Sequence, residues 1–148
     1  MAEGWVQKRF QKRLARLAQE KLQQQWQANA AASYNSMFDA MMNQVRADVT
    51  EYNRLFGEID SCNVEFLQRP DGFWVDRAGN QEKLTVTKNH GSTVINIQRN
   101  WGMPGMPEFD SIEVAPDAKG NVRLKKGDKF FADMTDVSEF ILGMFICE

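Results

Sequence analysis

The chain has 148 residues, of which 43% are hydrophobic, and a formal net charge of −2 at pH 7. This length fits one domain with or without an extended arm, and the hydrophobic content excludes a chain that is disordered throughout. No segment approaches the roughly 18 apolar residues of a membrane-spanning helix, and no apolar run follows the basic N-terminus as it would in a secretory signal. We therefore expect a cytoplasmic protein whose only two cysteines, Cys62 and Cys147, are reduced.

The first third of the chain lacks helix breakers. No proline or glycine lies between Gly4 and Gly57, a stretch of 52 residues rich in Ala, Gln, Leu, Lys and Arg. The pattern predicts one long helix, or two nearly continuous helices, that ends near Gly57, where we expect a positive φ. Its apolar positions recur about every 3.8 residues, so the stripe drifts around a straight helix. We expect a bend within residues 29–36, where serine and asparagine are weak helix formers.

The two halves of this helix differ in character. We interpret residues 1–30 as a basic amphipathic arm and residues 31–148 as one α+β domain, in which helix 37–57 packs on a sheet. Residues 1–27 carry a net charge of +4, so the rest of the chain carries −6. The arm's candidate interaction residues are Phe10, Leu14, Leu17 and Trp26, and its candidate anion contacts are Lys8, Arg9, Lys12, Arg13 and Arg16.

The arm suggests two kinds of partner. A basic arm on an acidic body favours self-association or docking to a protein partner, which is our first hypothesis. The alternative is a peripheral binder of an anionic membrane or of nucleic acid. The basic residues form no known nucleic-acid-binding motif, so the sequence favours the first hypothesis.

From residue 60 onward the hydrophobic pattern has a period of two. Short alternating runs separated by turn residues predict an antiparallel meander of about five to six short strands within residues 60–131. Apolar residues spaced as on one helix face then predict a C-terminal amphipathic helix over residues 135–146, with Asp133 among the residues able to cap it. We expect this helix to be a second cover on the sheet. The predicted fold is therefore α+β, a long N-terminal helix packed on the meander and closed by a short helix.

Residues suited to catalysis or metal binding are scarce. His90 is the only histidine and lies in a turn-like segment, and it forms none of the usual zinc spacings with the two cysteines. The glycines form no phosphate-binding loop. We therefore predict no catalytic residues, no metal and no cofactor, and we rank an enzyme or small-ligand-binding domain third.

Two further regions are candidates for an interface. The segment 101–107 is rich in glycine and proline and carries Trp101, Met103 and Met106, residue types that often anchor interfaces. It also fits a loop folded over an open sheet edge. Trp74 alternates with Phe73 and Val75, so we expect it on the opposite face of its strand, in an apolar patch.

Overall fold

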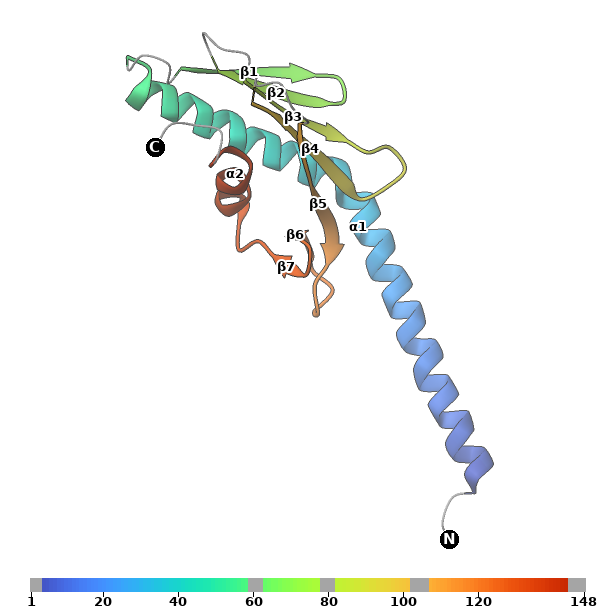
Figure 1. The fold of residues 1–148 in the computed structure, drawn as a ribbon. Coiled ribbons are helices and arrows are strands. Elements are labelled where there is room, and N and C mark those ends of the chain that lie inside the picture. The colour runs from blue at the N-terminus through green and yellow to red at the C-terminus, as the bar shows by residue number, and fades with distance from the viewer. Residues whose placement is uncertain (1–3, 59–62, 78–81, 102–106, 144–148) are drawn as a thin grey trace.

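The computed structural model describes residues 4–58, 63–77, 82–101 and 107–143. Figure 1 shows a long helix crossing one face of an antiparallel sheet and continuing far beyond it, with a short second helix on the same side. The helices are α1 (Trp5–Phe56) and α2 (Met134–Leu142). The strands are β1 (Val64–Arg69), β2 (Gly72–Arg77), β3 (Lys83–Lys88), β4 (Val94–Asn100), β5 (Glu108–Pro116), β6 (Val122–Lys126) and β7 (Lys129–Phe130). The predicted α+β class is confirmed.

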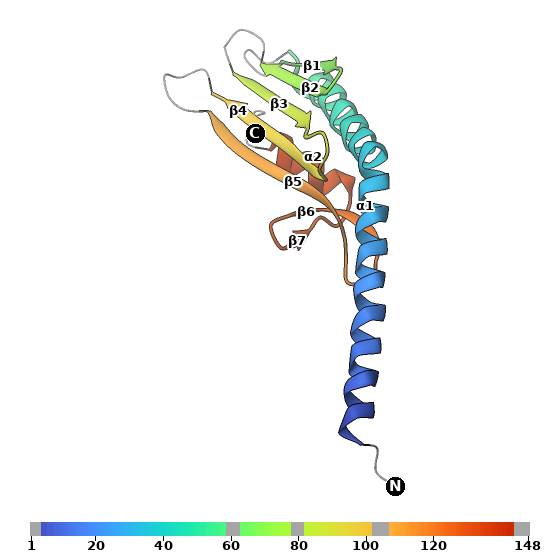
Figure 2. The ribbon, with the colours of Figure 1, turned by 90° about the vertical axis from the view of Figure 1, so that its right-hand side faces the viewer.

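Helix α1 is one continuous helix, the first of the two predicted alternatives, and residues 37–56 form its C-terminal part. Within residues 29–36 the Ser36 hydroxyl donates to the Ser33 carbonyl, so this polar side chain bonds inside the helix instead of interrupting it. Figures 1 and 2 both show the axis changing direction where the helix leaves the sheet. The helix ends at Gly57 with φ −64°, so the predicted positive φ is wrong; the Gly57 N–H donates to the Asn53 carbonyl in an ordinary helical bond.

The sheet is a meander with the strands in chain order, each antiparallel to the next. Within the described residues it has seven strands, one more than the predicted maximum. The additional strand, β7, is only two residues long and follows the Gly127 turn, where φ is +60°. Two residues cannot display a period of two, so the hydrophobic pattern did not reveal this strand.

One face of the sheet packs against α1. Alternate strand residues point to this face and form the core with the C-terminal half of α1. Its fully or nearly fully buried members include Phe38, Met41, Val45, Phe73, Val75, Leu84, Val86, Ile95, Ile97, Ile112, Val114 and Leu124. The second half of α1 thus packs on the sheet through its apolar stripe, as predicted.

Two polar side chains fix α1 against the strands. The Tyr34 hydroxyl donates to the Val94 carbonyl at 2.5 Å and accepts from the Asn89 N–H at 3.0 Å. Further along, the Asn53 side chain donates to the Val64 carbonyl at 2.6 Å and accepts from the Val64 N–H at 3.1 Å. These bonds hold the helix at both ends of its contact with the sheet.

Helix α2 packs against α1, with Val137, Ile141 and Leu142 in the core. We predicted a second cover on the sheet; α2 lies on the same face, but its main contact is with the long helix. Asp133 caps it, since its carboxylate accepts from the Asp136 N–H at 2.9 Å. The described helix ends at Leu142, and residues 144–146 of the predicted span lie outside the described residues.

Candidate functional site

The N-terminal part of α1 has no neighbour among the described residues outside the helix itself. Residues 4–25 are all exposed, and the first buried residue of the helix is Ala30. Six large apolar side chains stand in this solvated segment, with 43–69% of their surface exposed: Trp5, Val6, Phe10, Leu14, Leu17 and Leu22. The predicted candidates Phe10, Leu14 and Leu17 are among them. Singly exposed apolar residues are common, but six along 18 residues of one helix indicate a surface that a partner covers.

The basic residues of the arm lie on a different side of the helix from the apolar residues Phe10, Leu14 and Leu17. Arg9, Lys12, Arg13 and Arg16 line one shallow surface groove. Residues 36 positions apart lie about ten helical turns apart and therefore share one face of a straight helix. Three such pairs join the arm to the buried part of α1: Arg9 and Val45, Arg13 and Val49, and Arg16 and Tyr52. The basic face of the arm therefore continues the face that packs on the sheet further along. Phe10, Leu14 and Leu17 lie roughly a quarter of a turn away, and we call them the arm stripe.

Lys8, the remaining candidate anion contact, is exposed but does not line this groove. The Arg9 guanidinium lies 5.2 Å from the centre of the Trp5 ring. Within the described residues, the cationic face therefore consists of the four groove residues together with this aromatic neighbour.

Trp26 marks the boundary between the arm and the body. It is half-buried, and its ring occupies the space beside Gly120 in the β5–β6 turn. A Cβ atom at position 120 would lie only 2.5 Å from that ring, and the Gly120 φ of +83° also favours glycine. Trp26 is thus already in contact within the chain, unlike the rest of the predicted arm surface.

The remaining sequence candidates lie elsewhere. Trp74 points away from the fully buried Phe73 and Val75, as predicted, but two cations cover its ring: the Arg69 guanidinium carbon lies 3.6 Å and the Lys83 Nζ 3.1 Å from its centre. Trp101 packs against the core. Met103 and Met106 lie outside the described residues. The structure therefore does not gather the arm, Trp74 and Trp101 into one surface.

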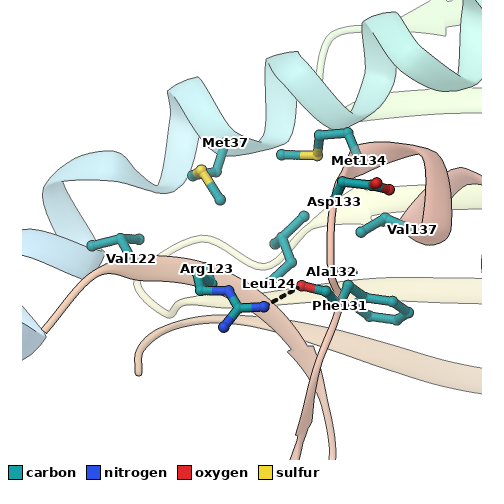
Figure 3. Close-up of a pocket in the computed structure, with 9 residues that line it drawn as sticks. All are labelled: Met37, Val122, Arg123, Leu124, Phe131, Ala132, Asp133, Met134 and Val137. Atoms are coloured by element: carbon teal, nitrogen blue, oxygen red, sulfur yellow. Dashed lines mark hydrogen bonds between the residues drawn. The ribbon is translucent and has the colours of Figure 1, made fainter. Parts of the chain in front are cut away.

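A small apolar hollow lies where α1, β6 and α2 meet (Figure 3). Its volume is about 130 Å³. Met37, Val122, Leu124, Phe131, Met134 and Val137 supply most of its wall, together with Arg123, Ala132 and Asp133. The Arg123 guanidinium donates to the Phe131 carbonyl at 2.7 Å and holds the loop before α2 in place. We call this cavity the apolar hollow.

Beside the hollow is a groove around a buried arginine. The Arg99 side chain is 2% exposed and points to the core face of β4, where it donates to the Phe140 carbonyl at 3.1 Å. Its guanidinium also lies 3.5 Å from Glu108 and 3.6 Å from Asp110, and Asp110 forms an ion pair with Lys126. We call the groove lined by Arg99, Glu108, Asp110, Asp136, Glu139, Phe131, Phe140 and Gly143 the acidic groove.

Sequence reasoning missed both features. The burial of Arg99 could have been predicted from the sequence, because the alternation that buries Ile95 and Ile97 also turns residue 99 toward the core. No sequence pattern predicts the hollow, because it depends on how three separate elements meet.

No catalytic arrangement emerges from the parts of the chain that the structure describes. His90 pairs with Asp71 at 3.0 Å, with both side chains largely exposed. Among the described residues, no cluster of three or more His, Cys, Asp or Glu side chains is arranged to hold a metal ion. In the same residues, no helix combines the length and apolar character needed to cross a membrane. Comparisons with protein-family models, with curated proteins and with solved structures find no match.

Proposed function

We propose that the protein is a non-catalytic self-association module that uses the N-terminal part of α1 to bind a second copy of itself. The observation that carries this proposal is the solvated helix with its exposed apolar residues. Each large apolar side chain gains roughly 1.5–3 kcal/mol when it moves from water into a packed interface. A partner that covers the arm stripe therefore has a substantial driving force, even after the cost of association is subtracted.

Charge favours a second copy over an unrelated partner. The arm is basic, with +4 over residues 1–27, while the remainder of the same chain carries −6. Two copies can therefore bring an arm and an acidic body together without any other molecule.

Sedimentation velocity over a range of protein concentrations tests this proposal. We expect Leu14→Asp combined with Leu17→Asp to weaken self-association at least about tenfold, since it places charges in the buried stripe. The matched control is Gln11→Asp combined with Ala15→Asp. It adds the same charges one helical turn apart, away from both the stripe and the basic face, and should associate like the wild type. A wild-type protein that remains monomeric at about 100 μM would overturn the proposal.

A second candidate function is binding to an anionic membrane surface or to nucleic acid. The observation in its favour is the groove lined by Arg9, Lys12, Arg13 and Arg16, four cations on one exposed helix face. This function predicts capture by anionic liposomes or by DNA, with affinity that falls steeply as salt is added. Reversing Arg9, Arg13 and Arg16 to Glu should then abolish capture, whereas the uncharged change Leu14→Ala with Leu17→Ala should affect DNA binding little. We favour self-association because the apolar stripe runs through the basic segment.

A further inference from the structure

We infer that the arm of one copy docks across the acidic groove and the apolar hollow of a second copy. This inference rests on the proposed self-association and specifies its receiving surface. The arm stripe would pack toward the hollow, and the basic face of the arm would lie along the carboxylates of the groove. The charges, the shape of the hollow and the course of α1 support this arrangement.

The acidic groove carries more negative charge than its own residues neutralise. Glu108 and Asp110 lie 3.5 Å and 3.6 Å from the one buried guanidinium, and with Asp136 and Glu139 the lining has a formal charge of −3, of which the Lys126 ion pair with Asp110 offsets one. Arg99 forms the floor, and its Nε is buried without a hydrogen-bond partner. Glu108, Asp136 and Glu139 remain accessible on the rim. A cationic helix face would complete the charge balance at this surface.

The apolar hollow adjoins the groove, and Phe131 lines both. A cavity of about 150 Å³ accepts a benzene-sized ring, so a hollow of about 130 Å³ is close to the size of one large apolar side chain. Met37 and Met134 form part of its wall, and methionine adapts its shape readily to an incoming group. Acidic and apolar surfaces thus lie side by side on the body, as basic and apolar faces do on the arm.

The arm cannot occupy this surface in its own chain. It is the continuation of one unbroken helix, and Figures 1 and 2 show it running away from the body. Only the arm of another copy can therefore reach the groove. If two copies exchange arms reciprocally the assembly closes as a dimer, whereas a one-way exchange continues as a chain of subunits.

A charge-exchange experiment tests this surface by sedimentation velocity. The groove-reversed variant is Asp136→Lys with Glu139→Lys, which leaves Arg99 its own partners. The arm-reversed variant is Arg9→Glu with Arg13→Glu and Arg16→Glu, which changes the net charge of residues 1–27 from +4 to −2. We expect each variant alone to associate at least about tenfold more weakly than the wild type, and an equimolar mixture to recover association. In the mixture, every arm finds a groove of opposite charge.

The control variant is Asp39→Lys with Glu65→Lys. It makes the same charge change at two exposed positions outside the groove and should associate like the wild type. Circular dichroism melting confirms that each variant is folded. If the groove-reversed variant associates normally while Leu14→Asp with Leu17→Asp does not, this docking surface is wrong and the proposed function stands. If the wild type itself does not associate, the docking surface and the proposed self-association are both wrong. If the mixture does not recover, the docking surface is also wrong.

Discussion

Two phenylalanines on the same helix test whether the C-terminal part of α1 belongs to the core while the arm does not. Phe38 is 1% exposed and lies 6.2 Å from Phe73, centre to centre, whereas Phe10 is 60% exposed in the arm. A buried aromatic side chain removes roughly 200 Å² from water, which is worth up to about 5 kcal/mol at about 25 cal/mol per Å². With the residual cavity included, Phe38→Ala should cost about 3–5 kcal/mol. Phe10→Ala should cost less than about 0.5 kcal/mol in the monomer.

Urea or guanidinium unfolding measures both variants against the wild type, at a protein concentration low enough to keep the chain monomeric. Both substitutions replace Phe by Ala in the same helix and change helix propensity equally. The difference between their losses of unfolding free energy therefore reports the difference in burial. A difference below about 1 kcal/mol would refute the packing of the second half of α1 on the sheet.

Three further predictions concern single contacts and the arm as a whole. Tyr34→Phe removes the hydroxyl that bridges α1 to the β3–β4 turn and should cost about 1–2 kcal/mol in denaturant unfolding. Gly120→Ala should be clearly more destabilising than Gly91→Ala, because both residues have positive φ but only position 120 faces the Trp26 ring; equal losses would contradict that contact. Deleting residues 1–24 should leave the circular dichroism melt of the body almost unchanged and should abolish self-association by sedimentation; loss of the fold would show that the arm belongs to the core.

The sequence was most informative where one periodicity extends over many residues. The absence of helix breakers over 52 residues predicted the long helix, and the period of two predicted the antiparallel meander. The Asp133 cap was readable because a cap depends on a few adjacent residues. These features are local, so composition and spacing are sufficient to predict them.

The errors arose where tertiary contacts or very short elements decide the outcome. Weak helix formers near Ser33 left open whether one helix or two nearly continuous helices form, and buried Ala30, Tyr34 and Phe38 hold one helix through that region. The sequence identified an amphipathic C-terminal helix but not its main neighbour, because an apolar face does not specify what covers it. The hollow and the groove likewise depend on distant elements, and only the position of Arg99 could be anticipated from strand alternation.

Asp110 should make the α2 side of the fold sensitive to acid. Burial raises the pKa of this carboxyl, but hydrogen bonds from Lys126 and from the Ser111 N–H, with the nearby charge of Arg99, outweigh it and leave the pKa below its ordinary value of 3.8. The folded protein therefore favours the ionised form. The resulting stability is fully present above the ordinary pKa and is lost as the pH falls through the lower pKa of the folded state.

We therefore expect the stability difference between the wild type and Asp110→Asn to stay constant from about pH 7 to pH 5 and to shrink below about pH 4. Urea unfolding at several pH values measures this difference directly. Asp39→Asn, at an exposed position of α1, is the control and should run parallel to the wild type across the range. If the Asp110→Asn curve also runs parallel to the wild type, the ionised carboxylate contributes nothing to stability. The ion pairs with Lys126 and Arg99 would then be incidental to the packing of this region.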